Sequence, residues 1–181
     1  YYTRLSVALD VLADTHLEEF PDIFCSSLID NCIKRGKTAK EGGAKYDIIA
    51  GLQVGLANAA NSLYALKRVV FEEKILTKEQ VFEALKTNFS GVEGERVRNI
   101  LLNVPKYGND IDEIDKFAVE TYNPYISEIA KYKNTRHGRG PIIGVYGLST
   151  SGISSNVPMG TVTGATPDGR YEYTPAAEGA S

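Results

Sequence analysis

The sequence predicts an α/β fold in which helices come first and strands follow. Over the first 135 residues, apolar residues recur every three or four positions, which is the period of an amphipathic helix. From Arg136 onward the composition changes, because this part holds more than half of the 17 Gly and of the 7 Pro. We therefore divide the chain into a helical part, 1–135, and a part with strands and turns, 136–181.

Two helices are expected at the start of the helical part. The first covers about 5–12, where the apolar residues share one face. Pro21, typical of a first helical turn, and Gly36, typical of the position after a helix, bracket the second. The expected buried stripe of this second helix consists of Phe24, Leu28 and Cys32.

The longest expected helix covers about 48–74. Its small residues Gly51, Gly55 and Ala59 recur every fourth position, and this spacing lets another backbone approach closely.

Three further helices are expected before the composition changes. Thr77 and Gln80 have the spacing of a capping box, which predicts a helix start at this point. The next helix covers about 93–102, and the last covers about 111–133. Core candidates on these helices are Val81, Phe82, Leu85, Ile114, Phe117 and Ala118.

The final part predicts two strands, over 141–148 and 149–157, with a connection or short strand over 160–164. Pro167, Asp168 and Gly169 predict a tight turn. Two strands alone cannot bury a sheet on both faces, so we expect partners from elsewhere and interpret the chain as a piece of a longer protein.

Composition narrows the class of partner. The net charge is −3 and 43% of the residues are hydrophobic, as in ordinary globular domains. No apolar run approaches the length that a membrane helix needs, so no membrane segment is expected. The basic residues between Lys131 and Arg139 are too few for a nucleic-acid surface. Two cysteines cannot form a multi-bridge framework, which favours a reduced, cytoplasmic protein.

Residues suited to catalysis are sparse. The two histidines, His16 and His137, have no companion at metal-ligand spacing, so neither a metal nor a catalytic residue is assigned. Cys25 and Cys32 lie in an apolar pattern, and we interpret both as buried structural thiols. The acidic residues over 110–115 are typical of the first turn of a helix, where they complement its dipole, rather than of a cation site.

Several strings in the sequence are more specific than its composition. They are Gly42–Tyr46 (GGAKY), Gly55–Leu63 (GLANAANSL), Val70–Glu73 (VFEE), Pro105–Asp110 (PKYGND), Val157–Gly160 (VPMG) and Gly164–Arg170 (GATPDGR). In order and spacing they resemble the glycyl radical enzymes over nearly the whole chain. Asn61, where the family usually has Asp, departs from the pattern and leaves the subclass open.

This resemblance implies a pyruvate formate-lyase-like fold, a ten-stranded α/β barrel around one loop with a thiyl-forming Cys and another with a radical Gly. It further implies that both loops lie outside this chain, since Cys25 and Cys32 match neither motif. The parts 1–135 and 136–181 would then be the outer helices and the barrel strands of one domain. Alone, the chain would be inactive.

The resemblance also suggests substrate-binding residues. In the family, the strand before the Val-Pro-x-Gly string lines the substrate cavity, and alternation along a strand would place Ser149, Ser151 and Ile153 on one face. They are as consistent with filling of the barrel wall. Glu41, beside a Gly-Gly turn, is a weaker candidate, since an exposed loop Glu is common.

The implied function is radical cleavage of a C–O, C–C or C–N bond in a small substrate, with a dehydratase preferred. An arylacetate-type decarboxylase and a formate acetyltransferase are alternatives within the family, and a non-catalytic helical interaction module is an alternative of another class. No cofactor would be bound, and a radical S-adenosylmethionine iron-sulfur activase would install the glycyl radical. Further expected partners are the rest of the parent polypeptide and a second copy in a homodimer.

Overall fold

The structure is a computed structural model that describes residues 22–46, 48–49, 54–131, 143–144 and 150–177, and the single positions 4, 5, 8 and 12. The chain divides into two compact units. The first comprises Tyr1–Leu52 and Asn123–Gly147, and the second comprises Gln53–Tyr122 and Leu148–Ser181. Most of the helix expected over 5–12, together with His16 and His137, lies outside the described residues.

Two short helices, α2 (Ile23–Ser27) and α3 (Cys32–Arg35), occupy the place of the single helix expected between Pro21 and Gly36. Asp22 caps α2 by accepting a hydrogen bond from a backbone N–H of its first turn at 3.0 Å. Asn31 takes a left-handed conformation, with φ of 77°, and so breaks the helical run. Gly36 ends α3 in the left-handed conformation that its position predicted.

The buried stripe expected on these helices is wrong in two of its three residues. Cys32 is buried, but Phe24 is 77% and Leu28 is 74% exposed. Cys25 is exposed too, so the prediction of two buried thiols holds for Cys32 alone. Because the helix breaks at Asn31, residues before and after the break no longer share one continuous face.

Two strands are described in the first unit. β1 (Ile48–Ile49) and β2 (Ile143–Gly144) pair in parallel, with Ile48 opposite Ile143. β1 lies where the sequence predicted the start of a long helix. β2 falls inside the strand predicted over 141–148, whose other residues lie outside the described ranges.

The second unit begins with a helix that changes type. α4 (Leu56–Leu66) continues directly into a π-helix, η1 (Lys67–Glu72). Gly55 precedes α4 with φ of 84°, a conformation that suits glycine, so this helix begins well after residue 48. The buried small residues of α4 are Ala57, Ala60 and Ala65. Of the stripe expected at every fourth position, Gly55 and Ala59 are half-buried and Gly51 lies outside the described residues.

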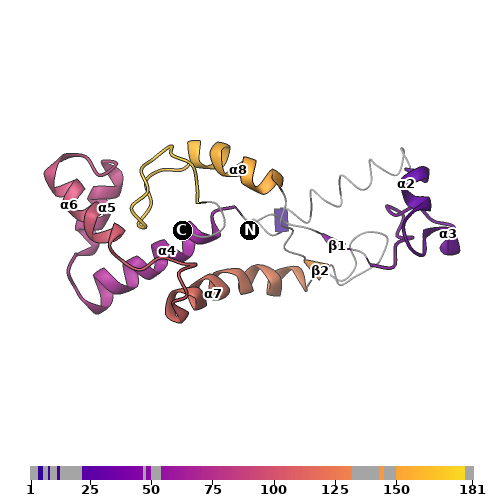
Figure 1. Cartoon of the computed structure of the whole chain (residues 1–181), viewed down its shortest axis with the longest axis horizontal. Coiled ribbons are helices and arrows are strands. Elements are labelled where there is room, and N and C mark those ends of the chain that lie inside the picture. The colour runs from indigo at the N-terminus through magenta and orange to yellow at the C-terminus, as the bar shows by residue number, and fades with distance from the viewer. Residues whose placement is uncertain are drawn as a thin grey trace. The chain divides into compact units, whose positions relative to one another are not determined.

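Helices α5 (Lys78–Lys86) and α6 (Gly91–Leu102) pack against each other in the second unit (Figure 1). The capping box before α5 is confirmed. Thr77 Oγ1 accepts a hydrogen bond from the Gln80 N–H at 3.2 Å, while the Thr77 N–H donates to Gln80 Oε1 at 2.8 Å. Phe89, between the two helices, is completely buried.

Helix α7 (Asp112–Ile129) confirms the last helix expected before the change in composition. Pro124 lies inside it without ending it. Ile114 and Ala118 are buried as predicted, and Phe117 packs against the core. The ring of Phe117 meets that of Tyr64 edge to face, with centroids 5.7 Å apart.

The expected order of helices followed by strands is wrong, because α8 (Thr150–Thr161) is a helix where the sequence predicted the strand over 149–157. One helical turn places Asn156 and Gly160 on the same face, and both are buried there. The carbonyl of Asn156 accepts a hydrogen bond from the Ala176 N–H at 3.0 Å. A Cβ at Gly160 would lie 2.2 Å from the Thr174 carbonyl oxygen. Packing against 174–176 therefore supports the helix, whereas the abundance of Ser, Thr and Val had favoured a strand.

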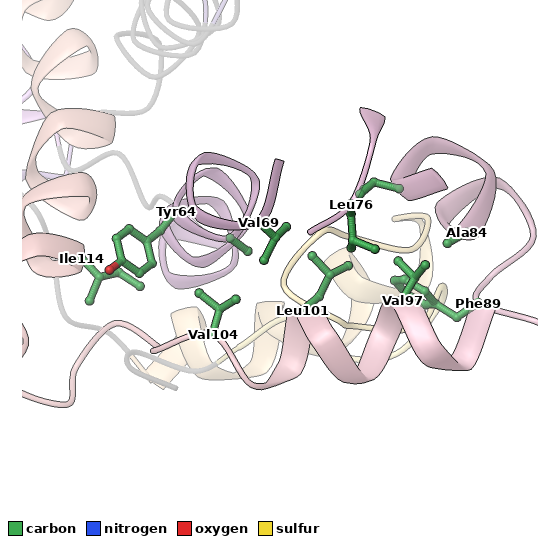
Figure 2. Packing of buried hydrophobic residues seen from close by; sticks show 11 residues of the cluster. Tyr64, Val69, Leu76, Ala84, Phe89, Val97, Leu101, Val104 and Ile114 are labelled. Atoms are coloured by element: carbon green, nitrogen blue, oxygen red, sulfur yellow. The ribbon is translucent and has the colours of Figure 1, made fainter. Parts of the chain in front are cut away.

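One hydrophobic core lies in the second unit, and Figure 2 shows how its side chains pack between α4, α5, α6 and the start of α7. Tyr64 points toward Ile114, and Val97 lies beside Phe89. The buried members of the cluster are Tyr64, Ala65, Val69, Leu76, Val81, Ala84, Phe89, Val97, Leu101, Val104 and Ile114.

Candidate functional site

The turn predicted at Pro167–Gly169 is confirmed, and it forms the centre of a polar cluster in the second unit. The Gly169 N–H donates to the Thr166 carbonyl at 3.0 Å, and the Thr166 N–H donates to the Arg170 carbonyl at 3.1 Å. Gly169 has φ of 93°, and a Cβ there would lie 2.7 Å from Leu102 Cδ2. The backbone conformation therefore favours glycine at position 169, and a Cβ there would also have to displace the end of the Leu102 side chain.

Asp168 is buried at the tip of this turn and accepts hydrogen bonds from three groups. Its Oδ1 accepts from Thr166 Oγ1 at 2.6 Å and from the Arg170 N–H at 3.4 Å. Its Oδ2 accepts from Asn58 Nδ2 at 2.5 Å. A buried carboxylate needs such donors, since they replace the water that it loses on folding.

Asn58 connects the turn at Asp168 to the backbone of Ala177. While its Nδ2 donates to Asp168, its Oδ1 accepts from the backbone N–H of Ala177 at 2.7 Å. Asn58 lies in the first turn of α4, so one side chain of that helix holds two positions nine residues apart.

Arg170 binds backbone carbonyls on both sides of its own position in the chain. Its Nε donates to Thr166 Oγ1 at 3.2 Å, and its terminal nitrogens donate to the carbonyls of Thr174, Thr163 and Gly164. The planar guanidinium has five donors in a fixed geometry, which suits it to gathering several carbonyls at once.

An open hollow of about 390 Å³ lies beside the cluster and carries more positive than negative groups. Arg98 stacks over the ring of Tyr171 at 3.9 Å and donates from Nε to the Gly169 carbonyl at 2.9 Å. Lys106 donates from Nζ to the Leu101 carbonyl at 2.7 Å. Burial lowers the pKa of Lys106, and the nearby Asp168 carboxylate opposes this shift.

The polar groups of this cluster hold the main chain in place. Its carboxylate, amide and guanidinium groups are bound to one another and to main-chain groups, and each such bond fixes the path of residues 163–177. Among the described residues, no three His, Cys, Asp or Glu side chains lie together as a metal site would require.

A second polar contact, between α4, η1 and α7, supports the same unit. Glu113 accepts from Lys67 Nζ at 2.7 Å and from the buried Tyr64 hydroxyl at 2.9 Å. These two hydrogen bonds, that of Lys67 first, lower the pKa of the Glu113 carboxyl. The pKa of Tyr64 is raised, chiefly by burial and then by its bond to Glu113. The acidic group at the start of α7 thus joins helices.

Among the predicted site residues, only the side chain of Glu41 is described. It is exposed in the loop after α3, and its Oε2 accepts from the Thr38 N–H at 2.8 Å. It also lines an open hollow of about 240 Å³ together with Cys32 and Ser26. This geometry is a local turn with room for a small group beside it.

Ser151 and Ile153 lie in α8, and Ser149 lies outside the described residues. The alternation that grouped the three on one face applies to a strand and not to a helix. Their assignment to a substrate cavity therefore depends on the family resemblance, and it stays a prediction.

Sequence reasoning missed Asn58, Arg98 and Lys106 as members of the polar cluster. Asn58 lies 110 positions from its partner Asp168, and no local pattern connects residues so far apart. A signal did exist for Asn61, which is polar at a buried position of α4 and accepts from the Tyr107 N–H at 2.7 Å. A polar residue within a helical stripe of small residues indicates such a contact.

The chain matches a known protein family and several known proteins. The family model described as pyruvate formate lyase-like matches residues 1–160. The whole chain aligns with the probable dehydratase YbiW of Escherichia coli strain K12 at 51% identity and covers 23% of that protein. It is 32% identical to the trans-4-hydroxy-L-proline dehydratase of Clostridioides difficile, with 94% of this chain and 21% of that protein aligned.

Solved structures agree. The glycerol-bound B12-independent glycerol dehydratase from Clostridium butyricum superimposes with a TM-score of 0.82 at 40% identity, over 98% of this chain and 22% of that one. Another match, with a TM-score of 0.79 at 28% identity, is a glycyl radical enzyme from Archaeoglobus fulgidus, and 97% of this chain and 22% of that one are covered. The chain spans about a fifth of the length of these relatives. It belongs to the pyruvate formate lyase-like family of glycyl radical enzymes.

Proposed function

We propose that the chain is part of a glycyl radical dehydratase, and that the full-length protein removes a hydroxyl group from a small polar substrate. The observation that carries this is the match, over almost the whole chain, to a glycerol dehydratase solved with glycerol bound. Further relatives are named as dehydratases of trans-4-hydroxy-L-proline and of (2S)-3-sulfopropanediol. The indoleacetate decarboxylase of Tractidigestivibacter scatoligenes matches at 29% identity, which supports a decarboxylase less well.

Within this proposal, the radical groups come from other parts of the parent protein. Cys32 is buried in α3, and its Sγ would lie 2.9 Å from a Cβ placed at Gly43, so the thiol is enclosed by its own loop. Cys25 is exposed, and the neighbouring Asp22 raises its pKa, which disfavours the thiolate. A glycyl radical installed by a radical S-adenosylmethionine activase would supply hydrogen-atom abstraction, and this chain would supply scaffold.

The substrate contacts from this chain are proposed at Ser149, Ser151 and Ile153, with Glu41 as a weaker candidate. Support comes from their position just before the Val157–Gly160 string. Small side chains there would leave room for a polar substrate. The division into parts 1–135 and 136–181 of one domain likewise stays a prediction.

A cytoplasmic location and a homodimer are part of the same proposal. Within the described ranges, no helix is both long and apolar enough to cross a bilayer. The relatives act on small substrates, as the names glycerol dehydratase and hydroxyproline dehydratase indicate, so a small molecule is the expected partner.

The full-length protein, activated with its cognate radical S-adenosylmethionine enzyme and a reductant, tests the function. Glycerol, 1,2-propanediol, trans-4-hydroxyproline, an arylacetate, and pyruvate with coenzyme A would be offered separately, and products would be measured by mass spectrometry. Loss of water from one of the first three supports the proposal. Decarboxylation of the arylacetate, formation of formate, or inertness toward all of them contradicts it.

The same assay also tests whether Ser151 lines the substrate cavity. Ser151→Phe should abolish turnover, because the added ring would fill space that holds substrate. Val157→Phe, at an exposed position of the same helix, should leave turnover unchanged. Equal turnover of the two variants would remove Ser151 from the site.

A further inference from the structure

We propose that Asn58 is a positioning residue, whose amide joins Asp168 to the backbone of Ala177 and so fixes residues 168–177 in the form that the active full-length protein requires. This inference rests on the proposed function for its catalytic readout. Hydrogen exchange at the Ala177 amide tests the bridge itself, independently of turnover.

The geometry calls for an amide at position 58. Nδ2 donates to Asp168 Oδ2 at 2.5 Å, and Oδ1 accepts from the Ala177 N–H at 2.7 Å. Asparagine carries a donor and an acceptor on one carbon, whereas aspartate has acceptors only and alanine has neither. One short, half-buried side chain therefore satisfies two partners of opposite polarity.

The bridge closes a loop that is otherwise held at separate points. Asn88 Oδ1 accepts from the Glu172 N–H at 2.9 Å, and the Tyr171 hydroxyl donates to Glu95 at 2.6 Å. Ala176 donates from its N–H to the Asn156 carbonyl at 3.0 Å. Each of these contacts fixes one position.

Asn58, in contrast, joins the turn at Asp168 directly to the backbone of Ala177.

The effect of losing the bridge should be local. The contacts of Tyr171, Glu172 and Ala176 remain when Asn58 is replaced. Arg170 also still donates to the carbonyls of Thr163, Gly164 and Thr174. The unit should therefore stay folded while Ala177 loses its anchor. A displacement of about 1 Å near a reacting centre can cost two orders of magnitude in rate, so turnover is more sensitive than stability.

An exchange of the two side chains separates the bridge from the identity of either residue. In the double variant N58D/D168N, the carboxylate at 58 accepts from the Ala177 N–H and from the amide at 168. The amide oxygen at 168 still accepts from Thr166 Oγ1 and the Arg170 N–H. Every hydrogen bond is kept and one donor changes direction. N58D alone places two carboxylates against each other, and N58A removes both bonds.

Hydrogen exchange at the Ala177 amide and turnover should be measured on the full-length protein and its variants. N58A should expose the amide, and both N58A and N58D should lower kcat about tenfold or more, since N58D loses the donor to Asp168. The double variant should keep the amide protected and bring kcat to within about threefold of the parent. Parental kcat in N58A would overturn the proposal. So would a double variant that fails to fold, or that folds without recovering either readout.

The two proposals fail in distinguishable ways. An unmodified protein without turnover on any substrate contradicts the proposed function, while exchange at Ala177 still reports on the bridge. An active protein whose Ala177 amide exchanges equally fast in N58A contradicts the bridge and leaves the function standing.

Discussion

Leu28 and Leu101 both lie in stretches that the sequence predicted as helices, yet Leu28 is 74% exposed in the first unit and Leu101 is completely buried in the second. Around Leu101, α4, α5 and α6 supply partners on several sides (Figure 2). The helix before Asn31 is one turn long, and its apolar residues Ile23 and Phe24 are exposed as well. The comparison teaches that apolar periodicity identifies a face, whereas burial depends on a partner segment.

The largest expected effect on stability comes from truncating Leu101, with Leu28 as the exposed control. Leu101→Ala should lower the free energy of unfolding by about 2–5 kcal/mol, because it leaves a cavity in a packed core. Leu28→Ala should change it by less than about 0.5 kcal/mol in the 181-residue chain. Urea unfolding measures both.

The same pair in the full-length protein sharpens the comparison. If the rest of the polypeptide covers α2, as we propose for a chain that spans a fifth of its relatives, Leu28→Ala should become destabilising there. An equal cost of the two substitutions in the 181-residue chain would show that Leu28 is buried within it, contrary to the structure.

Two glycines give the next effect. Gly160→Ala should destabilise the chain by about 1–3 kcal/mol, because the new Cβ would meet the backbone of Thr174 and Pro175. Gly164→Ala is the matched control, since a Cβ there meets nothing within 4 Å, and it should cost less than about 0.5 kcal/mol. Thermal unfolding would measure both, and similar shifts in Tm would argue against α8 packing on 174–176.

Capping should have a smaller effect. Thr77→Ala removes the hydroxyl oxygen that accepts from the Gln80 N–H and should cost about 1 kcal/mol. Ser90, at the same position before α6, makes no capping hydrogen bond through its side chain, so Ser90→Ala should cost clearly less. Chemical denaturation of the two variants checks this, and a larger loss at Ser90 would contradict the assigned caps.

The smallest effect concerns pH. The pKa of Glu113 is lowered in the folded state by Lys67 and Tyr64, so its stabilising contribution is present above the ordinary value of 4.5. It is lost as pH falls through the folded pKa. Glu113→Gln should therefore be less stable than the parent at pH 7, and the difference should shrink toward pH 3. Urea midpoints across this range measure it, and a difference that grows on acidification would reverse the assignment.

Local signals in the sequence predicted local structure well. The capping box at Thr77, the glycine that ends a helix at Gly36 and the turn at Pro167–Gly169 are all confirmed. Each depends on a few adjacent residues, whose hydrogen-bonding atoms or φ preference decide the outcome.

Sequence patterns predicted the structure less well where contacts with residues distant in the chain determine it. The Ser-rich stretch predicted as a strand over 149–157 is helical from Thr150 onward. Asn156 and Gly160 pack on residues 174–176, which lie 14 to 20 positions further along the chain. The pairing of Asn58 with Asp168 spans 110 positions and has no local trace. The motif strings, in contrast, predicted the family, because order and spacing over the whole chain are more specific than any one element.

We propose that this chain is scaffold in a glycyl radical enzyme whose radical residue lies outside residues 1–181. After activation of the full-length protein, electron paramagnetic resonance should show a glycyl radical doublet, and exposure to oxygen should then cleave the chain at the radical glycine. Mass spectrometry of the fragments locates that cut. We expect a cut outside residues 1–181, whereas the absence of a radical, or a cut within these residues, would contradict the assignment of this chain.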